Sequence, residues 1–326
     1  MAKTSRPSPR RKVVRRRLLI VGLALFLVVD AGLVWFALSH TRTPQSAAPL
    51  VTFPDDEAPG PSATPQTPIP TQDVPPSPDQ DASLTPPTRL LAARDGTVAW
   101  RATTGPCPAT TARPERSVDG GATWKTTDAT ATAGVVALQR LVPESRDVLS
   151  AVGADRADCS VMLVRTFVAG DNYRSYPAEL PASWFLERAT PNVVHTPLGD
   201  RAAPCPEVVA MDARGTRAAV LCASGEGFLS SDSAASWSPP VRVPGAVNVA
   251  LSGRGFWLAS VGADGCAGVR LTESGAAAGA APGCFPSAVP ASALAGQIAL
   301  SEADGMLWVW AGDDIRRSNN GGLVWQ

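Results

Sequence analysis

Side chains that could perform catalysis are few and scattered in this chain of 326 residues. The only histidines, His40 and His195, are far apart in the sequence, which excludes chemistry that depends on paired imidazoles. A serine hydrolase with a nucleophile elbow is not indicated, because no G-x-S-x-G segment is present. Residues 88–326 carry 22 acidic residues, enough for a glycosidase with two carboxylates, but nothing in the sequence singles out a pair. The residue types therefore favour binding over catalysis.

The formal net charge of zero hides a strong segregation of charge along the chain. Residues 1–17 carry eight basic residues and no acidic one, residues 41–87 have a net charge of −5, and residues 88–326 have a net charge of −2. A nucleic-acid-binding protein is disfavoured, since the only basic cluster is a short tail beside an apolar stretch. The 19 arginines of residues 88–326, against Lys125 alone, indicate a high-GC genome such as that of an actinobacterium.

Residues 18–38 read LLIVGLALFLVVDAGLVWFAL, in which Asp30 is the only charged residue. A helix of this length would be about 30 Å long, the thickness of a bilayer core. The positive-inside rule places the basic tail (residues 1–17) in the cytoplasm, where it can bind anionic lipid of the inner leaflet, and the rest of the chain outside. A cleaved signal peptide is the alternative, because Ala37 and Ser39 are small residues at the positions that a signal peptidase reads. We favour an uncleaved single-pass anchor, since the apolar stretch is longer than a usual signal core.

Residues 39–87 are predicted to be a disordered, proline-rich linker. Positions 41–87 hold 13 of the 31 prolines, and they lack the apolar periodicity that a folded core needs. In an extended polyproline conformation they would reach on the order of 145 Å. We interpret the segment as a passive spacer between the membrane and residues 88–326.

From about residue 88 the sequence changes to short apolar runs separated by Gly, Asp and Asn. Five segments contain two β-type runs around a turn: LLAARDGTVAWRA, VVALQRLVPESRDVLSAVG, VVAMDARGTRAAVLC, VALSGRGFWLASVG and IALSEADGMLWVWAG, which begin near Leu90, Val135, Val208, Val249 and Ile298. Four of the turns contain glycine, which tolerates the positive φ of tight hairpins. These segments predict five antiparallel hairpins.

An octapeptide that ends in an aromatic residue is a second repeated feature. The copies are SVDGGATW at residues 117–124, SSDSAASW at 230–237 and SNNGGLVW at 318–325, with a weaker TFVAGDNY at 166–173 and a very weak TESGAAAG from Thr272. Ser and Asp side chains can accept hydrogen bonds from turn backbone, Gly relieves a positive φ, and Trp can fold back into the core. The octapeptide is therefore predicted to be a structural turn between the third and fourth strands of each unit.

The five octapeptide starts are 49, 64, 42 and 46 residues apart. An average of about 48 residues per unit is within the range of propeller blades. We therefore expect an all-β domain over residues 88–326, a β-propeller of about five four-stranded blades. Because Gln326 directly follows the last octapeptide, either residues near 84–90 supply the final fourth strand or the ring is imperfectly closed.

The octapeptide resembles the Asp-box (BNR) repeat, S-x-D-x-G-x-T-W. The residues at its defined positions are Ser117, Asp119, Gly121, Thr123 and Trp124 in the first copy, Ser230, Asp232 and Trp237 in the second, and Ser318, Asn320, Gly322 and Trp325 in the last. The domain is thus similar to the Asp-box β-propellers, which include sialidases, sortilin-type receptors and photosystem assembly factors. The resemblance implies the fold, with the boxes as structural turns away from the ligand face, and it specifies no function.

All six cysteines lie in residues 88–326, and an even number outside the cytoplasm predicts disulfides. If the hairpins are arranged as propeller blades, the six cysteines lie on one face, opposite the octapeptide turns. Our first choice of pairs is Cys107–Cys159, Cys205–Cys222 and Cys266–Cys284. The likeness of VGADRADC to VGADGC instead suggests that Cys159 pairs with Cys205. No CxxC motif occurs and His195 is isolated, so we predict no metal site and no cofactor.

Sialidases of this family use an arginine triad, a Tyr–Glu nucleophile pair and an acidic Asp, and the resemblance does not extend to these residues. The R-I-P motif is absent from the start of the domain, where Arg89-Leu90-Leu91 stands instead. Tyr173 occupies the Trp position of a degenerate octapeptide, which favours a role in the core. Tyr176 with Glu179 is a weak candidate for the pair. Sialidase activity is therefore not expected.

Two longer connections, residues 174–204 and 274–295, are expected on the cysteine-bearing face. The first holds a mixture of aromatic and charged residues: Trp184, Phe185, Glu187, Arg188 and His195. Such a mixture suits a binding surface, and equally a surface loop held by an aromatic anchor. Our leading hypothesis is a membrane-anchored, extracytoplasmic β-propeller that binds a protein or an envelope glycan without catalysis. The alternatives are a glycan-directed hydrolase or lectin on the same propeller, and a purely structural envelope protein.

Overall fold

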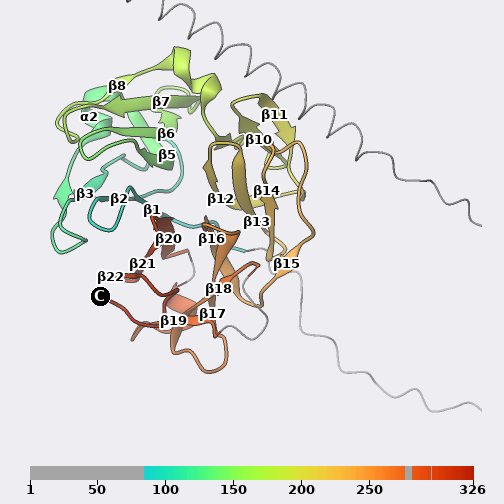
Figure 1. Ribbon diagram of the computed structural model, residues 1–326. Helices are drawn as coiled ribbons and strands as arrows, with labels where there is room; N and C mark the ends of the chain where they lie inside the picture. The colour runs from blue at the N-terminus through green and yellow to red at the C-terminus, as the bar shows by residue number, and fades with distance from the viewer. Residues whose placement is uncertain (1–83, 276–280, 295) are drawn as a thin grey trace, which may run out of the picture. The chain divides into compact units, whose positions relative to one another are not determined.

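The computed structural model describes residues 84–275, 281–294 and 296–326 (Figure 1). The predicted basic tail, the apolar segment 18–38 and the linker up to residue 83 lie outside these ranges. Among the described residues, no helix has both the length and the apolar character needed to cross a membrane.

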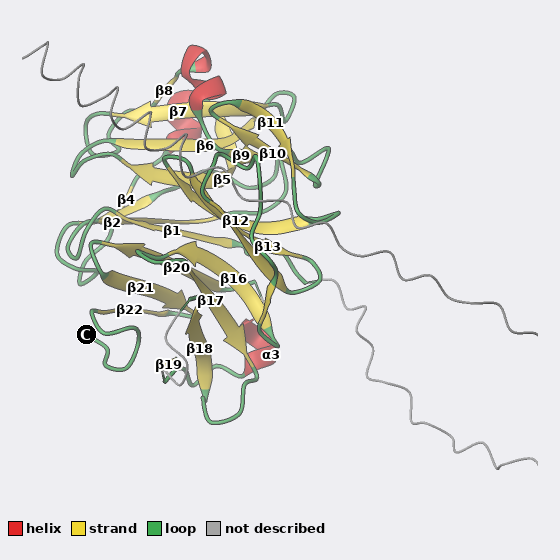
Figure 2. Ribbon diagram, turned by 45° about the vertical axis from the view of Figure 1, so that its right-hand side comes forward, coloured by secondary structure: helices red, strands yellow, loops and turns green. Residues whose placement is uncertain are grey.

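Six antiparallel sheets surround a central axis and form a six-bladed β-propeller (Figures 1 and 2). Blade 1 contains β1 (Arg89–Ala93), β2 (Ala99–Thr103), β3 (Glu115–Ser117) and β4 (Lys125–Thr126). Blade 2 contains β5 (Val135–Pro143), β6 (Leu149–Asp155), β7 (Val161–Thr166) and β8 (Arg174–Ser175). Blade 3 contains β9 (Phe185–Leu186), β10 (Val193–Thr196) and β11 (Gly199–Ala202).

The second half of the chain supplies the other three blades. Blade 4 contains β12 (Val208–Arg214), β13 (Arg217–Cys222), β14 (Glu226–Ser230) and β15 (Val241–Arg242). Blade 5 contains β16 (Ala246–Leu251), β17 (Phe256–Val261), β18 (Gly268–Glu273) and β19 (Gly283–Pro286). Blade 6 contains β20 (Ile298–Ala303), β21 (Met306–Ala311) and β22 (Asp314–Ser318). Short helices connect some of the strands: α2 (Ala129–Ala133), the 3-10 helix η1 (Pro177–Ala182) and α3 (Ala291–Leu294).

The five predicted hairpins are confirmed as β1–β2, β5–β6, β12–β13, β16–β17 and β20–β21. The expected number of five blades is wrong, because β9 to β11 form a further blade within residues 174–204. The sequence pattern instead predicts a surface connection for that segment. Its strands are only two to four residues long, and it contains none of the octapeptides, so neither repeated feature marks it. The interval of 64 residues between the octapeptide starts at Thr166 and Ser230 is longer than the others because it contains this blade.

Chain direction distinguishes the two faces of the propeller. In blade 1, β1 ends on the face where the octapeptide 117–124 follows β3, and the amide of Gly120 donates to the carbonyl of Thr97 in the β1–β2 turn (2.9 Å). The equivalent bonds in blades 2 and 4 run from Ala169 to Asp147 and from Ser233 to Thr216. We call this the turn face, and the opposite one the cysteine face.

The octapeptides form turns closed by their own side chains. In blade 1, Ser117 Oγ accepts from the amide of Gly121 (2.8 Å), whose φ of 89° favours glycine, and Asp119 Oδ1 accepts from the amide of Thr123 (2.9 Å). The bonds from the Thr123 hydroxyl and amide and from Ser117 lower the pKa of Asp119 to about 2. Trp124 is half-buried, and its indole donates to the carbonyl of Gly121 (3.0 Å). The turns are therefore held locally.

The same geometry recurs in other blades. Ser230 Oγ accepts from the amide of Ala234 (2.9 Å) in blade 4, and Ser318 Oγ accepts from the amide of Gly322 (2.9 Å) in blade 6. Hydrogen bonds led by that of the Ser236 hydroxyl lower the pKa of Asp232 to about 2. The very weak copy from Thr272 runs into residues 276–280, which lie outside the described ranges.

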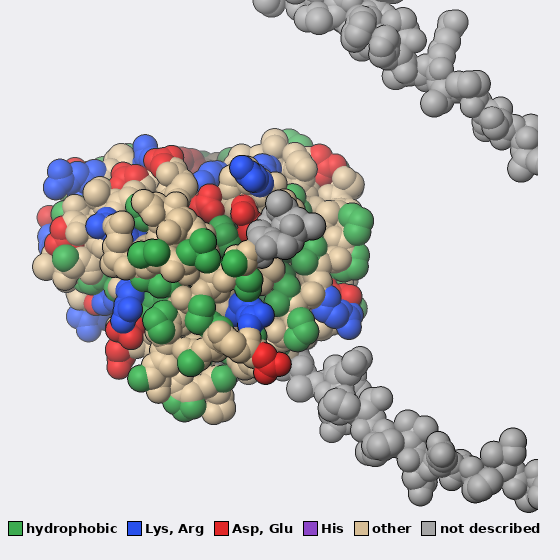
Figure 3. Space-filling view, turned by 60° about the horizontal axis from the view of Figure 1, so that its bottom comes forward, with side chains coloured by type: hydrophobic (Ala, Val, Ile, Leu, Met, Phe, Trp, Pro, Cys, Tyr) green, Lys and Arg blue, Asp and Glu red, His purple; other side chains and the backbone are tan. Residues whose placement is uncertain are grey.

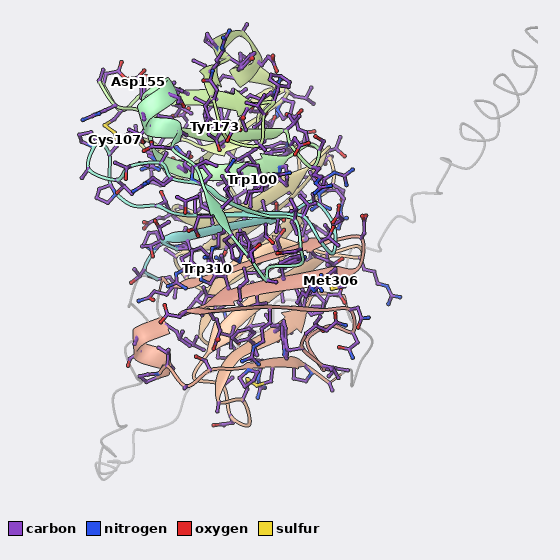
Figure 4. All side chains as sticks on the ribbon, turned by 90° about the vertical axis from the view of Figure 1, so that its left-hand side faces the viewer. Trp100, Cys107, Asp155, Tyr173, Met306 and Trp310 are labelled. Atoms are coloured by element: carbon purple, nitrogen blue, oxygen red, sulfur yellow. A yellow bond between two sulfur atoms is a disulfide. The ribbon has the colours of Figure 1, made fainter. Side chains whose placement is uncertain are left out.

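Three disulfides join Cys107 to Cys159, Cys205 to Cys222 and Cys266 to Cys284. These are the pairs of the first arrangement considered from the sequence, and not the alternative that joins Cys159 to Cys205. Figure 4 shows the propeller from the side, with Cys107 and Asp155 toward the cysteine face and Met306, at the start of β21, toward the turn face. The bond between Cys107 and Cys159 ties blade 1 to the β6–β7 connection of blade 2.

Side chains close the ring between the first and last blades. Strand β1 lies against both β20 and β5, and Ser301 Oγ on β20 accepts from the amide of Ala93 on β1 (3.0 Å). Of the two alternatives considered for the last blade, a fourth strand from residues near 84–90 is not found, because residues from Arg89 onward form β1 itself and the sheet of blade 6 has three strands. The place beside β22 is taken instead by Gln326, whose amide donates to the carbonyl of Arg317 (2.9 Å).

Candidate functional site

A channel with a volume of about 730 Å³ runs along the propeller axis. Strands β1, β5, β12, β16 and β20 line it, together with residues that precede β9. A residue at the beginning of its strand, Arg89, and a residue at the end of its strand, Arg214, both line the channel, which therefore extends along the length of the strands. Its mouth lies at the turn face, where it is bordered by exposed residues of the hairpin turns and by Pro197, in the turn between β10 and β11.

Arg140, on β5, provides a positive charge inside the channel. It is partly exposed and donates to the carbonyl of Trp184 (3.2 Å) and to the carbonyl of Ala213. Desolvation lowers the pKa of this guanidinium, while the charge of Asp212 acts in the opposite direction. In the described part of the chain, no carboxylate lies within ion-pair distance of Arg140. Two backbone carbonyl groups therefore hold the charged side chain of Arg140.

Arg165, on β7, organises the acidic groups on one side of the channel. Its Nε lies 3.1 Å from Glu144 Oε1, and its Nη2 lies 2.7 Å from Glu179 Oε2. Ser150 Oγ accepts from the same Nε (2.7 Å), and the guanidinium lies 5.3 Å from the ring centre of Tyr176. Both carboxylates are thus engaged by a single cation.

Four exposed arginines lie on the turn face, and two of them, Arg94 and Arg214, line the channel. The inner hairpins of four blades each carry one exposed arginine at the turn face: Arg94, Arg146, Arg214 and Arg254. None of the four takes part in an ion pair with another described residue. Arg94 donates to the carbonyl of Glu144 (3.3 Å), and Arg214 donates to the carbonyl of Glu302 (2.9 Å). These four residues, called the arginine ring below, give the turn face a set of positive charges that have no ionic partner in the described ranges.

The acidic groups near the mouth are mostly occupied within the fold. Glu302 Oε1 accepts from the amide of Gly253 (3.0 Å), and its Oε2 accepts from the indole of Trp257. Asp147 pairs with Arg116. Asp304, in the hairpin turn of blade 6, is exposed and forms no ion pair in the described ranges. The mouth therefore offers more available cations than anions.

The two tyrosines differ in their surroundings. Tyr173 is fully buried, as its octapeptide position predicts, and its hydroxyl lies 2.9 Å from the hydroxyl of Thr127. Burial raises the pKa of Tyr173 to about 12, with the Thr127 hydrogen bond acting in the opposite direction. Tyr176 faces Arg165 rather than standing free beside Glu179, whose carboxylate binds that same arginine. Glu179 is therefore engaged by Arg165 and is not free to act with Tyr176 as a nucleophile pair.

The residues expected on the loop 174–204 belong to blade 3. Trp184 and Phe185 are buried, which corrects their expected place on a surface connection, because Trp184 packs against blade 4 and Phe185 packs against blade 2. His195 lies on β10 and not in a loop; its ring stacks on Phe185 (4.2 Å), and its Nδ1 lies 2.6 Å from Asp200 Oδ1. Arg188 donates to the carbonyl of Ala137 in blade 2 (2.8 Å). This segment therefore stabilises the ring.

The arginine ring was not predicted, although the sequence contains a signal for it. In the hairpin segments the arginines stand at or next to the turn, as in RDG, SRD, ARG and GRG. Only the circular order of the blades brings the four positions onto one face of the propeller. The described residues hold no group of three or more His, Cys, Asp or Glu side chains that could bind a metal ion.

No protein-family model matches the sequence, and no curated protein matches it significantly. Solved structures match over about three quarters of the chain. YCF48 from Cyanidioschyzon merolae is 13% identical, with 74% of this chain and 85% of that chain covered and a TM-score of 0.38. Sqt1 from Saccharomyces cerevisiae is 11% identical over 72% and 71%, with a TM-score of 0.35. The GH74 xyloglucanase from Xanthomonas campestris is 17% identical over 73% of this chain and 37% of its own, with a TM-score of 0.25. These likenesses concern the propeller fold alone.

Proposed function

We propose that this protein is a non-catalytic binding module that holds an anionic group of a protein or envelope partner at the mouth of its axial channel. The arginine ring is the observation that carries this proposal. Guanidinium groups bind carboxylates and phosphates through paired hydrogen bonds, and these four have no competing ionic partner among the described residues. Because they come from four separate blades, they can contact one partner at several points.

The arrangement of the channel acids supports binding over hydrolysis. A glycosidase of the two-carboxylate type needs one carboxyl group that donates a proton and a second that acts as base or nucleophile. Here Glu144 and Glu179 are both bound by Arg165. Their oxygens contribute to the structure of the channel wall, and Asp212 Oδ2, in the same wall, accepts from the amide of Leu251 (2.9 Å). Of the channel acids, Asp304 alone has no partner among the described residues, so the arginines outnumber the acids that are available to a ligand.

We further propose that the propeller lies outside the cytoplasm, held by an anchor at residues 18–38 and a spacer at residues 39–87. The three disulfides are typical of an oxidising compartment. The eight basic residues before the apolar segment support this orientation. The recurring Ser and Asp hydrogen bonds of the octapeptide turns support assignment of the domain to the Asp-box propellers.

Site-specific crosslinking in cells tests the proposed function. A photoreactive amino acid at Thr216, on the turn face, should give a defined crosslinked product with the full-length chain. The same group at Ala157, exposed on the cysteine face, is the control and should give none. The combined variant R94Q/R146Q/R214Q/R254Q should lose the Thr216 product, since the ring supplies the binding charge. A product that persists in this variant, or that forms only through Ala157, would contradict the proposal.

A glycan-directed hydrolase is the second candidate, because the axial channel is open and Glu144 and Glu179 are two of the four carboxylates that line it. Release of new reducing ends from cell-wall polysaccharides is the measurement. Activity that disappears in both E144Q and E179Q would establish this function. Absence of release by the full-length chain would leave the binding function in place.

A further inference from the structure

Apolar side chains protrude from the turn face around the channel mouth. The exposed large hydrophobic residues of the described chain are Phe167 (55%), Val168 (51%), Leu198 (66%), Leu323 (59%) and Val324 (61%). All five stand in turns of the turn face, in blades 2, 3 and 6. Leu198 belongs to this face because its neighbour Pro197 borders the mouth together with the hairpin turns. We call these five residues the apolar tips. The view of another side in Figure 3 shows hydrophobic and charged side chains interspersed.

Three of the tips replace polar or small residues of the equivalent turns. Val168 stands at the third position of the octapeptide, where blades 1 and 4 have Asp, and at the sixth and seventh positions blade 6 has Leu323 and Val324 where blade 1 has Ala and Thr. At the second position, Phe167 stands where blade 4 has Ser231 and blade 1 has the smaller Val118. The turn itself needs no large apolar group, because the same backbone bond forms in blade 4, which has none at these positions. Turn geometry therefore does not explain their exposure.

The tips lie outside a charged centre. Blades 2 and 6 flank blade 1, blade 3 follows blade 2, and Arg94 and Arg214 of the arginine ring line the channel nearer the axis. A typical protein–protein interface has the reverse arrangement, with an apolar core and a polar rim. Separate apolar tips on one face, combined with cations between them, match a lipid surface, where apolar groups enter the interface and cations bind headgroup phosphates.

We propose that the turn face docks onto an anionic lipid surface. The apolar tips enter the headgroup region, and the arginine ring binds lipid phosphates through paired hydrogen bonds. This inference rests on the proposed function, since the ring is the same anionic-group site, and it names the partner as lipid. Charge complementarity favours this occupant over a neutral apolar partner, because the four ring arginines have no ionic partner in the described part of the chain.

The acidic residues of this face are compatible with such docking. Asp119 and Asp232 direct their carboxylate oxygens to hydrogen bonds within their own turns, which satisfies them without a cation. Asp304 is the exposed acid that would face the lipid without such bonds. The linker does not oppose the arrangement, since residues 41–83, extended as their composition predicts, would span on the order of 130 Å.

Vesicle flotation tests the inference with the full-length chain held in nanodiscs of phosphatidylcholine. Separate vesicles are made of phosphatidylcholine alone or of phosphatidylcholine mixed with phosphatidylglycerol. The wild-type chain should bind the mixed vesicles at least about tenfold more tightly than the neutral ones. The tip variant F167S/V168D/L323A/V324T should lose at least about tenfold in affinity. Each of its changes introduces a residue that an equivalent turn already contains, so the fold should be retained.

Hydrogen exchange provides a site-resolved readout on the same samples. Mixed vesicles should slow amide exchange in the turns 166–173 and 318–325, and leave the turn 230–237 of blade 4, which has no apolar tip, unchanged. Equal binding of neutral and mixed vesicles, or of the wild-type and tip variants, would overturn the inference.

The remaining outcomes separate this inference from the proposed function. If R94Q/R146Q/R214Q/R254Q loses the vesicles while the tip variant keeps them, the ring binds anions as proposed and lipid docking through the tips is refuted. If no vesicle binds and the tip variant instead loses a protein crosslinked through Thr216, the turn face is a protein interface and the inference is overturned. The proposed function survives that result.

Discussion

The guanidinium of Arg101 lies 4.8 Å from the ring centre of Trp310, across the junction between blades 1 and 6. The same group lies 4.3 Å from Trp124, so the cation is held between two indoles. Glu115 Oε2 accepts from the Nε of Arg101 (2.6 Å), and the guanidinium of Arg89 lies 4.4 Å from the ring centre of Trp310. Within the described residues the two blades share no sheet, and therefore side chains such as these close the ring.

Loss of this junction should destabilise the propeller. Trp310→Ala should lower the free energy of unfolding by about 3–5 kcal/mol, because it removes a buried indole. Arg101→Met should cost about 1–2 kcal/mol through the lost cation–π and ionic contacts. Denaturant unfolding is the measurement. The control is Arg113→Met, whose exposed pair with Asp128 (3.9 Å) should contribute at most about 0.5 kcal/mol. Equal effects of R101M and R113M would show that the indole contacts add nothing.

The turn aspartates should make stability fall in acid. In the folded chain the pKa of Asp119 and of Asp232 is lowered to about 2, against about 3.9 for an unfolded aspartate. The unfolded chain therefore takes up protons first, and the stability that these carboxylates contribute is complete above about pH 4 and is lost as the pH falls toward 2. The melting temperature, followed by circular dichroism across this range, is the measurement.

The variant D119N/D232N should lose less stability than wild type between pH 4 and pH 2. Asparagine fits this position, since Asn320 of blade 6 accepts from the amide of Val324 (2.9 Å) in the same way. Asp264→Asn, at an exposed site outside the octapeptides, serves as the control. An acid transition in D119N/D232N that coincides with that of D264N would refute the assignment.

The blades whose inner hairpins consist of long apolar runs could be predicted from the sequence. Each inner hairpin of blades 1, 2, 4, 5 and 6 has strands of at least five residues around a turn. Blade 3 escaped prediction because β9 has only two residues and depends on contacts with other blades, such as the bond from Trp184 Nε1 to the carbonyl of Gly215 (3.0 Å). The arginine ring escaped for a related reason. Arg94 and Arg214 are 120 positions apart, and only the circular arrangement of the blades brings them to one channel.

Tyr173 should produce a loss of stability in alkali. Burial raises its pKa to about 12, whereas an unfolded tyrosine ionises near 10. Between these values the unfolded chain releases its proton while the folded chain keeps it, so stability should decrease as the pH rises from about 10 to 12. Tyr173→Phe should remove this dependence, and it should cost about 1 kcal/mol at neutral pH through loss of the bond to Thr127.

The absorbance of tyrosinate offers a direct check, because the chain has only two tyrosines. Tyr173→Phe should abolish the late ionisation step near pH 12, and Tyr176→Phe should leave it in place. Persistence of the late step in Y173F would contradict the burial argument.

The disulfides should differ in their contribution to stability. The pair Cys107–Cys159 closes a loop with a sequence separation of 52, and Cys205–Cys222 closes one of 17. In the chain-entropy description, removal of the first should cost about 4 kcal/mol and removal of the second about 3 kcal/mol. Denaturant unfolding of C107S/C159S and C205S/C222S is the test, with each variant serving as the other's control. A larger loss in C205S/C222S would show that local packing outweighs loop length.

Arg140 should be required specifically for the order of blade 3. From β5 of blade 2 it donates to the carbonyl of Trp184, before β9, and to the carbonyl of Ala213 in blade 4, so one side chain bridges the small blade. Arg140→Met leaves both carbonyls without this donor, which should cost about 1–3 kcal/mol. Because blade 3 has the shortest inner strand, the loss should appear first as faster amide exchange in residues 184–202.

Arg217→Met is the matched control for this prediction. Arg217 bridges blades 4 and 5 in the same way, through the carbonyls of Ser252 (3.1 Å) and Gly255 (3.0 Å). Its loss should speed exchange in the β16–β17 turn and leave residues 184–202 unchanged, while R140M should do the reverse. If both variants speed exchange equally in both regions, the arginines support the ring as a whole and Arg140 has no special relation to blade 3.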